Sequence, residues 1–143
     1  MLFKRIVAAY DGSRESEKAL EKAIELANSA PGAKLDVVHV YQFPTIYIAD
    51  GLSMANTLNK ELMERAENLV ANLKKRLLET GMEANVELLH GTPSDTILKF
   101  AKEREADLIV IGSRGLSGIK EFFLGSVSHN VVQRSPIPVL VVK

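Results

Sequence analysis

The chain has 143 residues and no net formal charge at pH 7, and it contains no cysteine, 46% hydrophobic residues and 25% charged residues. This composition is that of a globular protein, and it excludes disulfides, thiol chemistry, thiolate-held zinc and the basic surface of a nucleic-acid-binding protein. No apolar run approaches transmembrane length, and the apolar start is too short for a signal peptide. We therefore expect one soluble, cytoplasmic domain over residues 1–143.

The first predicted unit is a strand over residues 2–10, a turn at 11–13 and a helix. The apolar run at 6–9 does not alternate with polar residues, which is typical of a parallel strand buried on both faces. Ser13 is the predicted N-cap of the helix, and the Pro-Gly pair at 31–32 ends it. Its predicted buried face consists of Ala19, Leu20, Ala23, Ile24 and Ala27.

The second unit starts with a strand over residues 35–41. The segment 42–56 is long and rather apolar for a βα loop, so it is interpreted either as a packed Ω-like loop or as a mobile lid over a site or partner surface. A long amphipathic helix is expected over 57–80, with Gly81 in the C′ position that ends it. The predicted core stripe of this helix is Leu58, Leu62, Ala66, Leu69, Leu73 and Leu77.

The third unit is a strand over residues 85–90 and a helix that begins within 92–95, with Pro93 at its first position. The buried face of this helix is predicted to carry Ile97, Leu98, Phe100 and Ala101.

Three further elements close the chain. The unpatterned apolar run at 108–111 is the fourth predicted strand. A short helix is expected over 127–134, and it stops before Pro136. Residues 139–142 form the last predicted strand. Alternating strands and helices with unpatterned strands indicate an α/β fold, in which helices cover both faces of an open five-stranded parallel sheet.

The segment between the fourth strand and the last helix is rich in glycine. Four of the nine glycines of the chain lie within residues 112–125. Glycine lets a ligand approach the backbone closely, and the unpaired N–H groups at a helix start suit phosphate. Gly112, Gly115 and Gly125 are separated by two and nine residues, and Ser126 follows. This spacing predicts a loop that binds an anionic ligand.

The pattern G-x2-G-x9-G-[ST] resembles the nucleotide-binding signature of the universal stress protein family, in its ATP-binding branch. The resemblance covers nearly the whole chain, because the turn at 11–13, the strand at 38–40, the Gly-x-Pro at 91–93 and the closing segment 136–142 also match that family. It implies an adenine-nucleotide alpha-hydrolase-like (Rossmann-like) sheet of strand order 3-2-1-4-5. In such a sheet the ligand lies where the strand order reverses, here between strands one and four.

The resemblance implies a site for ATP, or for ADP or AMP, with Mg²⁺ held mainly by the phosphates. Asp11 is expected to contact the ribose or a metal-bound water, and Val40 the adenine. The predicted nucleotide-binding residues are Ala9, Asp11, Val40, Gly112, Ser113, Arg114, Gly115, Gly125, Ser126, Val127 and Ser128. No catalytic residue is predicted.

Several of these residues also have a purely structural interpretation. Asp11 could serve only the turn, Ser126 could serve only as an N-cap, and Arg114 could be solvated. Among the histidines, His39 is expected to have a satisfied structural role inside its strand, while His90 lies away from the predicted crevice. His129 in the last helix could approach a phosphate, but we expect no catalytic role for it.

The leading functional hypothesis is a nucleotide-dependent sensor or switch of the stress response. The alternative is a slow ATP hydrolase, but the chain lacks a GxxxxGK[ST] loop and an identifiable base or arginine finger. Adenylation chemistry would require an S-G-G-x-D-S loop or HIGH-type motifs, which are absent. An interaction module without ligand is disfavoured by the intact glycine pattern. A dinucleotide-binding interpretation fails because the G-x-G start is missing.

The last strand is expected to form a homodimer interface. In the order 3-2-1-4-5 it lies at an edge, and an apolar edge strand aggregates unless it is paired or covered. Antiparallel pairing about a two-fold axis closes the edge of both subunits, and the family resemblance implies the same arrangement. The alternative is a monomer in which the last helix and the preceding loop cover this edge. The expected contact residues are Val139, Leu140, Val141 and Val142.

Overall fold

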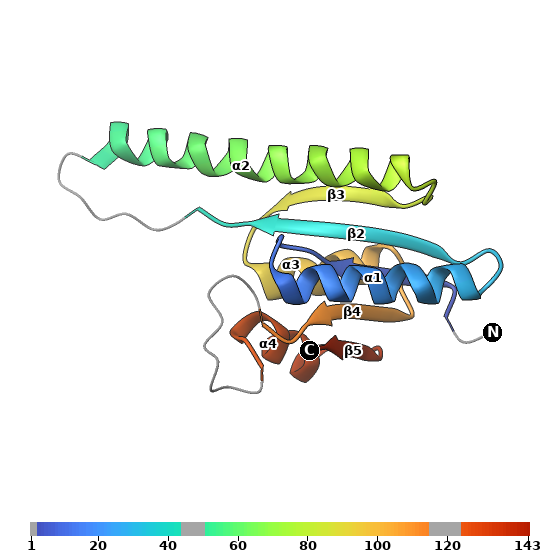
Figure 1. The fold of residues 1–143 in the computed structure, drawn as a ribbon. Helices are drawn as coiled ribbons and strands as arrows, with labels where there is room; N and C mark the ends of the chain where they lie inside the picture. Colours follow the sequence, from blue (N-terminus) through green and yellow to red (C-terminus); the bar gives the residue numbers. More distant parts are fainter. Residues whose placement is uncertain (1–2, 44–50, 115–123) are drawn as a thin grey trace.

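The computed structural model describes residues 3–43, 51–114 and 124–143 (Figure 1). Their strands form one parallel sheet of order β3-β2-β1-β4-β5, which confirms the predicted fold class and strand order. The strands are β1 (Arg5–Ala9), β2 (Lys34–Tyr41), β3 (Asn85–His90), β4 (Leu108–Gly112) and β5 (Val139–Val142). The helices are α1 (Arg14–Ser29), α2 (Gly51–Glu79), α3 (Pro93–Glu103) and α4 (Ser126–Arg134).

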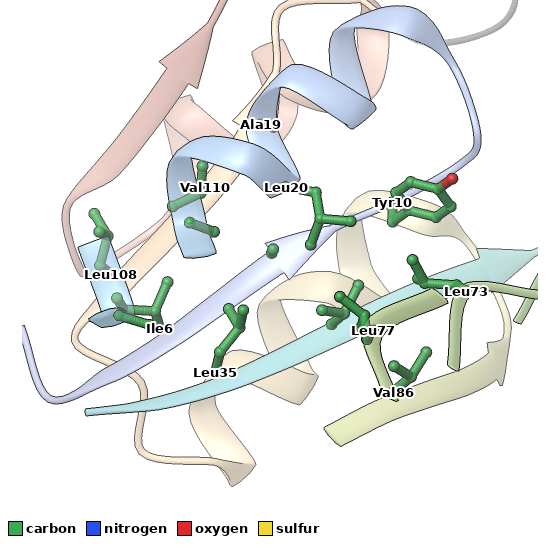
Figure 2. Packing of buried hydrophobic residues seen from close by; sticks show 14 of the residues in the cluster. Ile6, Tyr10, Ala19, Leu20, Leu35, Leu73, Leu77, Val86, Leu108 and Val110 are labelled. Atoms are coloured by element: carbon green, nitrogen blue, oxygen red, sulfur yellow. The ribbon is translucent and has the colours of Figure 1, made fainter. Parts of the chain in front are cut away.

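Two helices cover each face of the sheet, and each face has its own hydrophobic cluster. On one face α1 and α2 pack through side chains such as Leu20 and Leu73 onto the strands (Figure 2). On the other face α3 and α4 contribute Phe100 and Val131. The side chains of β1 enter the two clusters alternately. This burial on both faces explains why its apolar run shows no alternation in the sequence.

The predicted helix ends are confirmed at the three positions where a single residue caps, starts or stops the helix. The Ser13 hydroxyl caps α1 by accepting from the Ser16 N–H, and Pro93 is the first residue of α3. Gly81 has φ +73, and the Met82 N–H donates to the Leu77 carbonyl at 3.0 Å. These two features form a Schellman motif, which satisfies the last carbonyls of α2.

Some predicted boundaries are wrong. Helix α2 begins at Gly51, so residues 51–56 are helical and not part of a loop, because their good helix formers extend the amphipathic helix backwards. Strand β1 covers only Arg5–Ala9, and α4 starts at Ser126, one residue earlier than expected. The two interpretations of the loop concern mainly residues 44–50, which lie outside the described residues. None of the described helices has the length and hydropathy needed to cross a membrane.

Candidate functional site

The turn after β1 is stabilised by its own side chains. The Asp11 carboxylate accepts the Ser13 N–H at 2.9 Å, and the Ser13 hydroxyl oxygen in turn accepts the Ser16 N–H at 3.2 Å. Gly12 has φ +82, and a Cβ at this position would lie 3.0 Å from the Leu69 side chain. The turn therefore requires glycine for its conformation, and the N-cap side chain of α1 satisfies one of the orphan N–H groups of the helix, that of Ser16.

The end of β4 is tied directly to the start of α4. The Ser113 carbonyl accepts from the Gly125 N–H at 2.7 Å and from the Ser128 hydroxyl at 2.8 Å, while its own N–H donates to the Val142 carbonyl at 2.8 Å. Ser113 and Ser128 are both buried. The two ends of the glycine-rich segment are thus fixed next to each other, independently of the residues between them.

The turn after β1 and the end of β4 are in contact. A Cβ at Gly112 would lie 2.7 Å from the backbone carbonyl carbon of Glu15 and 2.9 Å from its oxygen, so the first turn of α1 packs against the bare backbone of β4. The Arg114 guanidinium lies 3.5 Å from the Glu15 carboxylate. The carboxyl ends of β1 and β4 therefore meet at the point where the strand order reverses, which is where the topology rule expects a ligand crevice.

The start of α4 is open toward polar ligands. Its N-cap is Gly125, which provides no side-chain hydrogen bond to the helix, so the interpretation of Ser126 as the N-cap is wrong. Among the described residues, the N–H groups of Ser126 and Val127 have no hydrogen-bond acceptor. Unpaired N–H groups at the positive end of a helix dipole form a favourable environment for an anion.

The remaining predicted residues lie around this crevice. Ala9 is buried at the end of β1, and Val40 and Val127 pack against the same hydrophobic cluster on the α3 and α4 face. Gly115 lies outside the described residues. The predicted residues that are described thus come from the ends of β1, β2 and β4 and from the start of α4.

The histidines differ in their surroundings. The Nδ1 atom of His39 lies 2.8 Å from the Tyr10 carbonyl, and since a carbonyl only accepts, Nδ1 carries the proton. Burial lowers the pKa of His39, although this hydrogen bond and the charge of Asp11 act in the opposite direction. The predicted structural role of His39 is confirmed. His90 and His129 are exposed, and His90 stacks near Tyr41 and Phe43.

The contacts of two glutamates near the predicted crevice were not predicted from the sequence. Glu15 pairs with Arg114, and Glu17 accepts from the Tyr10 hydroxyl and from two Arg76 nitrogens at 2.8 and 3.1 Å. Burial and the hydrogen bond to Glu17 raise the pKa of Tyr10 to about 12. Both glutamates appear in the sequence as ordinary first-turn acids of a helix, so no local pattern distinguishes them from solvated residues.

A hollow lies away from the predicted crevice, between the end of β3 and one side of α3. Its lining residues are Leu89, His90, Asp95, Thr96, Lys99, Phe100 and Glu103. Asp95 is engaged by Arg134, and none of the predicted site residues contributes to it.

The parallel sheet whose strand order reverses between β1 and β4 defines an α/β protein of the doubly wound class. The model of the universal stress protein family matches residues 2–143. The chain therefore belongs to the universal stress protein family.

Individual relatives agree with this assignment. The universal stress protein YxiE of Bacillus subtilis is 36% identical, and the match covers 99% of this chain and all of that protein. Among solved structures, MJ0577 of Methanocaldococcus jannaschii superposes with a TM-score of 0.82 at 32% identity, covering 100% of this chain and 97% of its own. The universal stress protein from Archaeoglobus fulgidus, solved in complex with dAMP, gives a TM-score of 0.62 at 29% identity with full coverage of both chains.

Proposed function

We propose that this universal stress protein binds ATP and acts as a nucleotide-dependent sensor or switch of the cytoplasmic stress response. The observation that carries the proposal is the open start of α4, where the N–H groups of Ser126 and Val127 meet no acceptor among the described residues. This helix start faces the sheet end at which ligands of such folds bind. The dAMP complex of the Archaeoglobus fulgidus relative supports an adenine nucleotide as the ligand.

The roles of the individual residues follow from their positions. The small side chain of Ala9 and the apolar side chain of Val40 would contact the base, and Asp11 the ribose or a metal-bound water. The single hydroxyl proton of Ser128 is shared between the carbonyls of Ser113 and Gly125, so its backbone N–H is the group that would serve the ligand. The proposed phosphate-binding residues are Gly112, Ser113, Arg114, Gly115, Gly125, Ser126, Val127 and Ser128.

Mg²⁺ would be held mainly by the phosphates of the nucleotide. Within residues 3–43, 51–114 and 124–143, no three His, Cys, Asp or Glu side chains form a cluster that could bind a metal ion. Mg²⁺ commonly keeps several waters and binds through substrate phosphates with few protein ligands. The chemistry of the described residues therefore fits a metal that arrives with the nucleotide.

The first experiment identifies the ligand. Protein purified without added nucleotide is denatured, and the released small molecules are analysed by mass spectrometry. Calorimetry then measures ATP affinity for the parent protein, for Gly125→Val and for the matched control Gln133→Ala on the exposed side of the same helix.

We expect Gly125→Val to abolish binding, because its side chain occupies the space of the phosphate, while the control binds normally. The backbone of Gly125, with φ −69 and ψ 167, accommodates valine, so cooperative thermal unfolding should persist. Unchanged affinity in Gly125→Val would overturn the assignment.

Intrinsic hydrolysis is expected to be slow or absent, well below the ordinary enzyme range of about 1–10³ s⁻¹. The reason is the missing lysine loop and the lack of a base that positions water. A steady-state assay with Mg²⁺ measures the rate. Turnover of many molecules per second, lost in Asp11→Ala, would favour the ATP hydrolase instead.

We also propose a homodimer through Val139, Leu140, Val141 and Val142. Strand β5 pairs only with β4 among the described residues. The carbonyls of Pro138 and Val142 accept from β4 and the following loop. Because backbone groups alternate along a strand, the N–H and C=O groups of Val139 and Val141 point away from β4. These outward groups are available for a second copy.

Val141→Pro tests this interface, since it removes an outward donor and leaves the bonds to β4 intact. We expect weaker association by light scattering or sedimentation, with unchanged helical content. Leu140→Pro is the contrasting variant, because its N–H faces β4 and its loss should destabilise the fold. A parent protein that is monomeric at tens of micromolar would exclude the β5 interface.

A further inference from the structure

A carboxylate lies inside the proposed nucleotide crevice. The Glu15 side chain is only 19% exposed, and its charge is balanced by Arg114, which is 30% exposed and 3.5 Å away. An acidic group next to a phosphate site opposes ligand binding by Coulomb repulsion unless a cation neutralises it. We therefore expect Glu15 to have a role other than direct contact with the ligand.

The position of Glu15 is fixed by its backbone. The backbone carbonyl of Glu15 packs against Gly112, where even a Cβ would approach to 2.7–2.9 Å. Ser13 also caps α1, so the first turn of the helix is well formed where it packs against the end of β4. The Glu15 carboxylate consequently stays within reach of residue 114.

Arg114 has two possible partners. It follows Ser113, whose carbonyl accepts from Gly125 and Ser128 at the start of α4. Its backbone is therefore held close to the unpaired N–H groups of α4, while its guanidinium contacts Glu15. A guanidinium binds carboxylates and phosphates with the same planar geometry. The long side chain can thus exchange one anion for the other.

We propose that Glu15 competes with the nucleotide phosphates for the Arg114 guanidinium. Without nucleotide, Glu15 holds Arg114; when nucleotide binds, Arg114 moves to the phosphate and Glu15 loses its partner. Glu15 thereby lowers the affinity for nucleotide and makes release of the ion pair part of binding. This inference rests on the proposed nucleotide-binding function and names a regulatory residue of the same site.

The test is calorimetry with MgATP on the parent, Glu15→Gln, Arg114→Gln and the double variant. Glu21→Gln, exposed on the same helix, is the matched control and should bind as the parent does. Glu15→Gln should bind about two- to fivefold more tightly, the range that a partly exposed ion pair covers. Arg114→Gln should bind at least about fivefold more weakly, because a charged hydrogen bond is lost.

The double variant identifies the cause. If Glu15 acts through Arg114, Glu15→Gln gives a smaller gain when Arg114 is already replaced, because only the direct repulsion of the phosphates by the carboxylate is then removed. The affinity for adenosine, which has no phosphate, should not change in Glu15→Gln. An undiminished gain without Arg114, an equal gain for adenosine, or no gain for ATP would each overturn this inference while leaving the binding function intact. Failure of the parent protein to bind any adenine nucleotide would instead overturn the proposed function itself.

Discussion

Helices α1 and α4 both start at the point where the strand order reverses, but their first turns are completed in different ways. In α1, the Ser13 hydroxyl accepts a backbone N–H, and Asp11 accepts the N–H of Ser13. In α4, the N-cap is Gly125 and offers no side-chain acceptor. The two starts therefore differ at the third helical N–H: that of Ser16 in α1 has the N-cap hydroxyl as its acceptor, whereas that of Ser128 in α4 has no acceptor among the described residues and is a donor of the kind that a phosphate satisfies.

This difference separates residues that hold the fold from residues that serve a ligand. Changes at the turn after β1 and at Gly112 should affect stability in addition to any effect on the ligand, because these residues also make contacts within the protein. Changes at the start of α4 should affect nucleotide affinity, because its N–H groups meet no acceptor among the described residues. The predictions below use matched pairs of variants to test this division.

The largest effect on stability is expected for Gly112→Ala. The Cβ of an alanine at this position would lie 2.7–2.9 Å from the Glu15 backbone. The backbone of a helix cannot shift to relieve such a clash, whereas a flexible side chain can. The expected loss is about 1–3 kcal/mol, as for other overpacked sites, measured by urea denaturation. The matched variant is Gly125→Ala, whose extended backbone accepts alanine and which should cost only about 0.5–1 kcal/mol, the difference between glycine and alanine at an N-cap. Equal losses in the two variants would contradict the assigned role of Gly112.

The second prediction concerns the cap of α1. Ser13→Ala removes the acceptor for the Ser16 N–H at a buried position. We expect a loss of about 1 kcal/mol in the free energy of unfolding. Ser13→Asp, which restores an acceptor, should recover part of this loss. An unchanged denaturation midpoint in Ser13→Ala would show that the cap does not contribute to stability.

The third prediction concerns the start of α4. Ser126→Ala should leave stability within about 0.5 kcal/mol of the parent, because Gly125 and not Ser126 is the N-cap. Its ATP affinity should fall by about 0.5–1.5 kcal/mol, the net contribution of one hydrogen bond. Calorimetry and thermal denaturation of the same sample measure both quantities. A loss of stability without loss of affinity would reverse the proposed contrast between the two helix starts.

The smallest effect is expected for the ion pair that attaches α1 to α2. Burial alone would raise the pKa of Glu17, but hydrogen bonds from Arg76 and Tyr10 outweigh it and hold this pKa below the ordinary value of 4.5. A lowered folded pKa stabilises the protein above the unfolded pKa, and this contribution disappears as pH falls through the folded value.

Glu17→Gln should therefore cost about 0.2–1 kcal/mol at pH 7, since both partners are partly exposed. The difference from the parent should shrink below about pH 4.5. Denaturation curves at pH 7, 5 and 3.5 measure this trend, and Glu21→Gln on the same helix is the control. A difference that grows toward acid pH would mean that the pKa of Glu17 is raised and not lowered.

Local sequence patterns determined most of the fold of this protein. The unpatterned apolar runs identified the buried strands, and Ser13, Gly81 and Pro93 set helix ends because caps and φ restrictions act over only a few residues. The glycine spacing and the flanking segments resemble those of the universal stress protein family, and this resemblance indicated the family, the strand order and a site between β1 and β4. The start of α2 could not be found in this way, because good helix formers near a glycine are compatible with both loop and helix.

Only the tertiary structure decided which residues of the crevice face one another. Gly112 looks like any loop glycine in the sequence, but the packing of α1 on β4 gives it a close contact with Glu15. Glu15 and Arg114 are 99 positions apart, so no local pattern could pair them. The caps of α1 and α4 also differ. The turn before α1 supplies the Ser13 hydroxyl as an acceptor for the helix. Before α4, the Ser113 carbonyl accepts from the N–H of the N-cap residue Gly125. Such contacts depend on how the sheet places its strand ends, and this arrangement exists only in the folded chain.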